Sequence, residues 1–191
     1  MSEEIRKTRQ MRSMPCQFRA SEDADKKVIE GHFAVFGSNY ELWPGATESI
    51  DSHAFDNTLG GDIRALINHE TRLVLGRTKA GTLSLDVDNL GLHGVIEINP
   101  DDQEAMNLYS RVKRGDVSQC SFGFDIISEE TQVNGDKVHW TIKEVKLYEV
   151  SCVTFPAYEE TAIAARKSDY DQIQKRKHDL WKTTMKERMK K

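Results

Sequence analysis

Strand-like sequence dominates residues 28–155, and only one long segment there has a clear helical pattern. The strand-like segments are rich in β-branched and aromatic residues, and turns that contain glycine separate several of them. The predicted strands are residues 28–36, 63–68, 83–87, 92–98, 117–127, 137–143 and 145–155. Because strands and helices do not alternate regularly, the order is not that of a βαβ fold. It predicts a mostly antiparallel sheet or small barrel, with helices packed outside.

The clearest helix is predicted between Pro100 and Gly115. Acidic residues 101–102 suit the positive end of a helix dipole, and Gly115 is a typical C-terminal stop. The apolar residues recur at the i, i+3, i+4, i+7 spacing of one helix face, namely Ala105, Leu108, Tyr109 and Val112. A second, short helix is predicted over residues 52–59, with Ser52 as its N-cap.

The two ends of the chain differ from this strand-rich part. Residues 1–14 are polar and charged, which predicts a flexible extension. Residues 166–191 carry ten Lys or Arg and four Asp or Glu, a net charge of +6, and their partial helical spacing predicts a basic helical tail. The rest of the chain has 17 basic and 27 acidic residues, a net charge of −10. One domain over residues 15–165 and an interaction arm are therefore predicted.

The sequence excludes several classes of protein. No segment approaches the ~20 consecutive apolar residues that a membrane span needs. The first residues lack the apolar centre of a secretory signal, and the three cysteines form no C-x-x-C pair, so a reduced cytoplasmic protein is expected. Phosphate-loop, dinucleotide-binding and H-E-x-x-H motifs are missing, which argues against a nucleotide-dependent enzyme or a zincin.

Ser121 is a candidate nucleophile on the predicted strand at residues 117–127. Alternation places Cys120, Phe122 and Phe124 on the core face, and Ser121 and Gly123 on the opposite, open face. A nucleophilic serine needs fixed geometry and an open face, and Gly123 would leave room for a substrate chain. A surface serine on a half-exposed strand is the alternative. The same alternation argues against Cys120 as the nucleophile.

Two further residues complete the candidate set. His69 directly follows a predicted strand, where an imidazole can project into a cleft, although a histidine is more often structural than catalytic. Glu149 interrupts an otherwise mostly apolar strand face, and a carboxylate there is costly unless it is paired. A histidine that becomes positive during catalysis is one partner, and a structural ion pair with Lys or Arg is the other reading.

Taken together, these segments resemble the tailed-phage prohead (capsid maturation) protease family over residues 15–165. The matching segments are N-H-E at 68–70, S-F-G-F at 121–124, L-Y-E-V-S-C-V-T-F-P-A at 147–157, G-H-F-A-V-F-G-S at 31–38, H-A-F-D-N-T-L at 53–59, L-G-R-T at 75–78 and N-L-G-L at 89–92. The resemblance implies a serine endopeptidase related in fold to herpesvirus assemblin. That fold is a small, mostly antiparallel β-barrel surrounded by helices, of the α+β class.

The resemblance also implies roles for the candidate residues. Ser121 would be the nucleophile, His69 the general base, and Glu149 the residue that orients His69, with His53 and His93 as alternatives for this third position. Such chemistry needs no metal or cofactor. A metal hydrolase that uses the histidines at positions 32, 69 and 93 has no supporting spacing.

The implied substrates are the scaffold protein or delta region, the major capsid protein and the protease itself, inside the immature prohead in the host cytoplasm. A homo-oligomer is compatible with this role, whereas a membrane or a specific nucleic acid is not expected as a partner. The competing function is a catalytically inactive capsid-assembly factor that binds through the basic tail.

Overall fold

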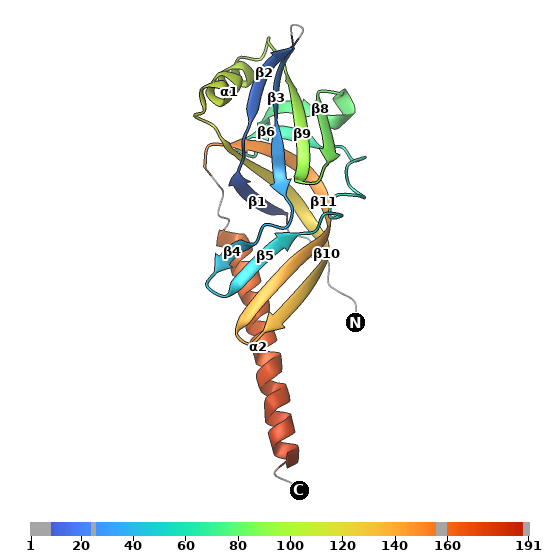
Figure 1. Ribbon diagram of the computed structural model, residues 1–191, viewed down its shortest axis with the longest axis vertical. Helices are drawn as coiled ribbons and strands as arrows, with labels where there is room; N and C mark the ends of the chain where they lie inside the picture. Colours follow the sequence, from blue (N-terminus) through green and yellow to red (C-terminus); the bar gives the residue numbers. More distant parts are fainter. Residues whose placement is uncertain (1–8, 24–25, 156–159, 189–191) are drawn as a thin grey trace. The chain divides into compact units, whose positions relative to one another are not determined.

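The structure is a computed structural model that describes residues 9–23, 26–155 and 160–188 (Figure 1). The chain separates into two compact units, Met1–Ala157 and Tyr158–Lys191. The described strands all belong to the first unit. They are β1 (Gln10–Pro15), β2 (Arg19–Asp23), β3 (Lys26–Val35), β4 (Tyr40–Trp43), β5 (Ala46–Ile50), β6 (Arg64–Ile67), β7 (Glu70–Arg77), β8 (Leu83–Val87), β9 (Gly91–Ile98), β10 (Gln119–Asn134) and β11 (Lys137–Val153).

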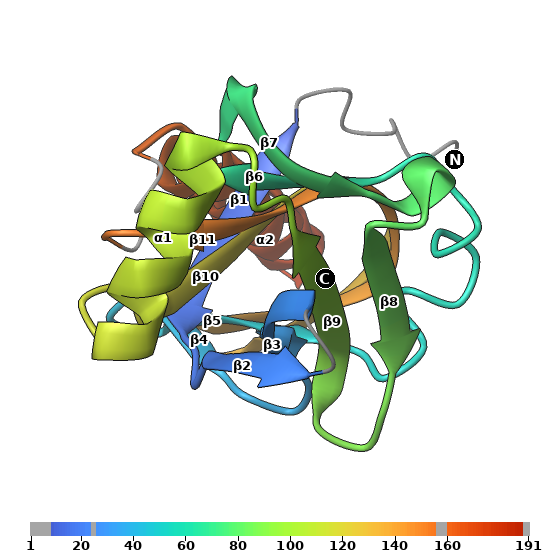
Figure 2. The ribbon, with the colours of Figure 1, turned by 90° about the horizontal axis from the view of Figure 1, so that it is seen from above.

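Helix α1 (Gln103–Arg114) forms as its sequence predicts. The side chain of Asp102 caps its start by accepting from the backbone N–H groups of Glu104 and Ala105. Gly115 ends it in the left-handed region, with φ of 88°. The predicted apolar stripe is buried, and α1 lies along one side of the strands (Figure 2). A short 3₁₀ helix, η1 (Thr78–Ala80), is the other helical element of this unit among the described residues.

The long hairpin of β10 and β11 organises the first unit. The predicted Asn134-Gly135 turn joins the two strands, which pair antiparallel from Asn134 and Lys137 back to Gln119 and Val153. The first half of β11 pairs with β5 and its second half with β6, and both of these pairings are parallel. One sheet therefore has the order β1-β10-β11-β5-β4, with β6 and β7 continuing from the far end of β11. The second sheet has the order β2-β3-β9-β8.

The expected mostly antiparallel pairing is confirmed for the described strands, since seven of their nine pairings are antiparallel and the two parallel ones join β5 and β6 to β11. The expected closure into a small β-barrel is wrong, because the two sheets do not close. The reason lies in strand length: at about 3.3 Å per residue, the 17 residues of β11 span about 55 Å. A strand this long pairs with different partners along its two halves, β5 and then β6. Its sheet therefore stays open and does not form a closed barrel. The predicted mixture of mostly strands with few helices is confirmed.

The expected flexible N-terminal extension is wrong for residues 10–14, while residues 1–8 lie outside the described residues. Strand β1 pairs antiparallel with β10, and Gln10, Arg12 and Met14 are buried. The Arg12 guanidinium forms a bidentate ion pair with Glu48, whose carboxylate is 1% exposed. The alternating pattern of a half-buried strand was hidden because two of its inward positions are polar.

The segment at residues 52–59 is also different from its prediction. It forms successive turns instead of a helix, with backbone bonds from Ala54 to Asp51 and from Thr58 to Phe55 at three-residue spacing. Asp51, not Ser52, accepts the backbone N–H of His53. The turns bury Ala54 and Phe55 completely, and the Phe55 ring packs edge-on against Phe122 of β10. Core packing therefore sets this segment's path.

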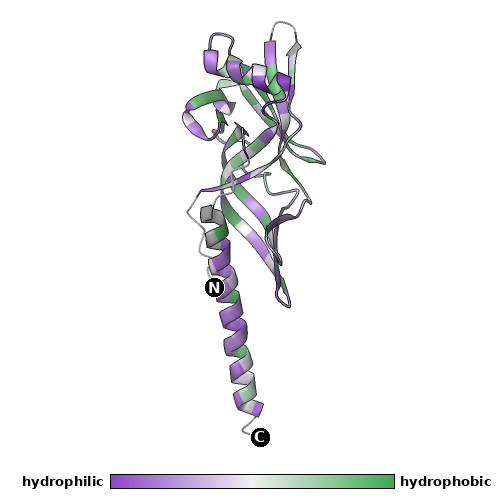
Figure 3. Cartoon of the chain, turned by 90° about the vertical axis from the view of Figure 1, so that its left-hand side faces the viewer, coloured by the Kyte–Doolittle hydropathy of each residue, from purple (hydrophilic) through white to green (hydrophobic). Residues whose placement is uncertain are grey.

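The second unit contains α2 (Glu160–Arg188), which confirms the predicted helix in the tail. Figure 3 shows mostly hydrophilic residues along it, with isolated hydrophobic ones. Leu180, Trp181 and Met185 are its exposed large apolar side chains among the described residues. Within residues 9–23, 26–155 and 160–188, neither helix is long and apolar enough to cross a lipid bilayer.

Candidate active site

His69 occupies a tight turn between β6 and β7. Asn68 and His69 both have positive φ, 49° and 62°, and Ile67 pairs with Glu70 across the turn. Two positive φ values are typical of two-residue hairpin turns, and Asn and His tolerate this region better than most residues. The Asn68 backbone N–H donates to the carbonyl of Cys152 at 3.0 Å, and its side-chain oxygen accepts from the Thr154 N–H at 2.9 Å. The turn is thus fixed to the end of β11.

The structure brings the imidazole of His69 into contact with Glu149 of β11. The distance between Nδ1 of His69 and Oε1 of Glu149 is 2.7 Å, and the two side chains are 13% and 4% exposed. A carboxylate can only accept a hydrogen bond, so Nδ1 carries the proton and donates it. In the neutral form of the ring, Nε2 of His69 is then the nitrogen that can accept a proton. This nitrogen is buried and has no hydrogen-bond partner among the described residues.

Ser151, two residues after Glu149 on the same strand, contacts both members of this pair. Its hydroxyl donates to Oε2 of Glu149 at 2.6 Å and accepts the backbone N–H of His69 at 3.3 Å. Ser151 is fully buried. The candidate set from the sequence did not include it, although the i, i+2 relation to Glu149 already places the two side chains on one strand face.

Gly123 of β10 has a different role from the one expected. It pairs with Glu149 across the hairpin, and a Cβ atom at Gly123 would lie 2.4 Å from Oε1 of the glutamate. The expectation that Gly123 leaves room for a substrate chain is therefore wrong. The carboxylate of Glu149 occupies that space.

Ser121 lies on the same strand face as Gly123 and directly opposite Ser151 in the β10–β11 pairing. Directly opposite residues of an antiparallel pair have Cβ atoms about 4.5–5.5 Å apart, so Ser121 is next to the His69–Glu149 pair. The expected open face is wrong: Ser121 is 0% exposed. Its hydroxyl donates to the backbone carbonyl of Arg12 at 3.0 Å, and not to His69. Strand β1, which was not predicted, supplies this acceptor.

The other candidate residues lie elsewhere. His53 is largely exposed and hydrogen-bonds Asp56. His93 contacts Asp86 and the ring of His32 in the second sheet. Cys120 is buried, and burial raises the pKa of its thiol well above the ordinary value. A thiol held protonated in this way is a poor nucleophile, in agreement with the argument from strand alternation.

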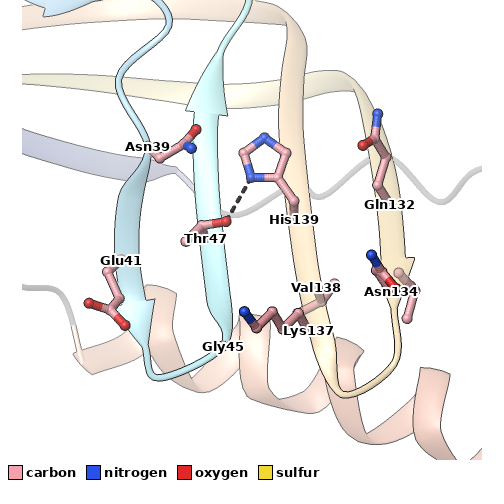
Figure 4. A pocket seen from close by; sticks show the side chains of 10 residues that line it. Asn39, Glu41, Gly45, Thr47, Gln132, Asn134, Lys137, Val138 and His139 are labelled. Carbon is pink, nitrogen blue, oxygen red and sulfur yellow. Dashed lines mark hydrogen bonds between the residues drawn. The ribbon is translucent and has the colours of Figure 1, made fainter.

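A separate hollow of about 570 Å³ lies on the face of β4, β5, β10 and β11, away from the candidate residues (Figure 4). His139 lines it, and its two ring nitrogens hydrogen-bond the hydroxyls of Thr47 and Ser49. These contacts satisfy both nitrogens, so His139 has a structural role. Throughout the part of the chain that the structure describes, no group of three or more His, Cys, Asp or Glu side chains is arranged to hold a metal ion.

Comparison with known proteins assigns the family. The sequence profile of the caudovirus prohead serine proteases matches residues 15–176, which is most of the chain. The chain belongs to this family. The resemblance noted in the sequence is confirmed, and the matched region contains the whole His69, Ser121 and Glu149 set.

Two individual phage proteases are similar to the chain, one in sequence and one in structure. The prohead protease of Enterobacteria phage HK97 is 28% identical over 151 residues, which cover 76% of this chain and 63% of that protein. The chain therefore spans less than two thirds of the length of this relative. The solved structure of the bacteriophage T4 capsid assembly protease, gp21, matches with a TM-score of 0.51 at 8% identity, over 78% of this chain and 98% of that one. At this identity the likeness shows a shared fold.

Proposed function

We propose that the protein is a serine endopeptidase that matures the phage prohead. In this proposal Ser121 is the nucleophile, His69 is the general base and Glu149 orients His69. The observation that carries it is the buried hydrogen bond between Nδ1 of His69 and Glu149. This bond leaves Nε2 free to take a proton. Glu149 and its neighbour Ser151 lie opposite Gly123 and Ser121 in the β10–β11 pairing.

The His69–Glu149 pair performs the task that an acid–histidine pair has in serine proteases. The carboxylate holds the ring in the tautomer with the proton on Nδ1, and it stabilises the imidazolium that forms when Nε2 takes the proton of the nucleophile. His69 then returns this proton to the leaving amine. The backbone of His69 is held by the contacts of Asn68 and Ser151, and its ring is held by the hydrogen bond to Glu149.

Ser121 must change its hydrogen bond before it reacts. Its hydroxyl donates to the Arg12 carbonyl in the structure, and attack on a peptide requires the proton to face Nε2 of His69. The side chain is also fully buried, so a peptide reaches it only after the site opens. We infer that the structure corresponds to a resting arrangement in which nucleophile and base are adjacent but not yet engaged.

The proposed substrates are the scaffold protein or delta region, the major capsid protein and the protease itself. The names of the two relatives, a prohead protease and a capsid assembly protease, support a site of action inside the immature shell in the host cell. Self-cleavage would remove a segment outside the β-rich unit, such as the basic tail at residues 166–191. A fold related to the herpesvirus proteases, and self-association inside the shell, belong to the same proposal.

Co-expression with the major capsid protein and scaffold of the same phage tests the proposal. Wild-type protease should shorten these proteins and itself on a gel, whereas Ser121→Ala should leave all of them at full length. Ser49→Ala, which removes a buried hydroxyl bonded to His139, serves as the control and should process normally. Normal processing by Ser121→Ala would refute the assignment. Absence of processing by the wild type would favour the inactive assembly factor.

A further inference from the structure

Ser151 is the group that connects the two partners of the candidate dyad. One hydroxyl makes two hydrogen bonds, a donation to Oε2 of Glu149 at 2.6 Å and an acceptance from the backbone N–H of His69 at 3.3 Å. The carboxylate is thereby linked to the turn that carries the imidazole, through an atom other than the imidazole itself. The serine is 0% exposed, so water does not replace either bond.

The carboxylate of Glu149 needs this donor. It is 3% exposed, and a buried carboxylate without hydrogen bonds on both oxygens is costly. Oε1 accepts from His69, and Ser151 donates to Oε2. Without Ser151, Oε2 would be left unpaired and the carboxyl group would be free to rotate about its terminal bond. The direction of the Oε1 lone pair toward His69 would then no longer be fixed.

The geometry also separates the roles of the two serines that face each other across the β10–β11 pair. The Ser151 proton is committed to a carboxylate oxygen at 2.6 Å, whereas the Ser121 proton is held by a neutral backbone carbonyl at 3.0 Å. A hydrogen bond to a charged acceptor is about twice as strong as a neutral one. Ser121 is therefore the serine whose proton is more easily redirected toward His69.

We propose that Ser151 is a positioning residue of the active site. It fixes the orientation of the Glu149 carboxylate and holds it to the His69 turn, so that Nδ1 keeps its hydrogen bond to Glu149 and Nε2 stays available as the base for Ser121. This inference rests on the proposed protease function for its effect on catalysis. The effect on the His69–Glu149 hydrogen bond is independent of that function.

The test compares full-length wild type with Ser151→Ala and with the control Ser49→Ala, another buried strand serine whose hydroxyl bonds an imidazole. Steady-state cleavage of purified capsid protein gives kcat and KM. Proton NMR gives the downfield resonance of His69 Nδ1–H, assigned by its loss in His69→Ala. Circular dichroism checks the fold, and Ser151→Cys, with similar shape and a weaker donor, replaces Ser151→Ala if that variant does not fold.

Ser151→Ala should lower kcat about 10- to 100-fold with KM unchanged, because a displacement of about 1 Å in a catalytic group costs this much. The His69 resonance should shift or broaden, and Ser49→Ala should match the wild type in both measurements. A wild-type kcat in Ser151→Ala, or a lowered kcat with an unchanged His69 resonance, would overturn the positioning role. If the wild type cleaves nothing, the protease proposal fails, and the resonance alone decides whether Ser151 positions the pair.

Discussion

Gly123→Ala is the substitution whose effect the structure predicts most directly. A methyl group at this position would lie 2.4 Å from Oε1 of Glu149 and 3.1 Å from two of its carbon atoms. Ordinary contact begins at about 3.4 Å, so the carboxylate must retreat by about 1 Å. It cannot do so and keep both the 2.7 Å bond to His69 and the 2.6 Å bond to Ser151.

The expected loss follows from that displacement. A misplacement of about 1 Å in a catalytic arrangement costs about 10²-fold in rate, so Gly123→Ala should lower kcat by about this factor. KM should change little, because the carboxylate contacts the base and not the substrate. The strand itself should remain paired, since alanine adopts extended backbone at less entropic cost than glycine.

Cleavage of the capsid protein, followed on gels over time, measures the effect, and thermal unfolding checks that the variant remains folded. Gly60→Ala is the matched control, because no atom lies within 4 Å of a Cβ placed there. Gly60→Ala should behave as the wild type. A folded Gly123→Ala that cleaves at the wild-type rate would refute the argument that Glu149 must occupy this space.

Three other substitutions test separate parts of the account. Glu149→Gln should stay folded and lose about 10⁴-fold in kcat, because the amide no longer fixes the imidazole tautomer; a loss below tenfold would contradict the assigned role. Glu48→Ala leaves the Arg12 guanidinium buried without its carboxylate and should lower the free energy of unfolding in urea by about 3–5 kcal/mol, whereas an unchanged midpoint would refute it. Hydrogen bonds from Arg77 lower the pKa of Asp62 from 3.8 to about 2. The ionised carboxylate therefore stabilises the folded state above about pH 4, and this stabilisation is lost as the pH falls toward 2. Asp62→Asn should remove this part of the acid dependence of the melting temperature, and an unchanged acid profile would contradict the pairing.

The elements that were predictable from sequence are those that local rules specify. Helix α1 has its apolar stripe, its Asp102 cap and its Gly115 stop within sixteen residues of chain. The Asn134-Gly135 turn is equally local. Strand β1 is the opposite case, because the side chain that makes its inward Arg12 favourable is Glu48, 36 residues away. An ion pair over that separation leaves no periodic signal in the sequence.

The same distinction explains the candidate site. A lone carboxylate on an apolar strand face indicated a buried partner for Glu149, and the structure places His69 there. The burial of Ser121 was not predictable, because alternation separates the two faces of a strand but does not say whether the second face is also covered. The use of Gly123 as space for Glu149 depends on the register between β10 and β11, which a single strand pattern does not contain.

The proposed protease mechanism requires that His69 activates Ser121. Labelling of the full-length protein with a fluorophosphonate, which phosphonylates an activated serine hydroxyl with loss of fluoride, tests this claim directly. The reagent is added under the conditions in which the wild type processes capsid protein, when the site that buries Ser121 is open, and peptide mass spectrometry locates the label. We expect a label on Ser121 in the wild type and none in His69→Ala. A label on Ser151 instead, no label in the wild type, or equal labelling of Ser121 in His69→Ala would contradict it.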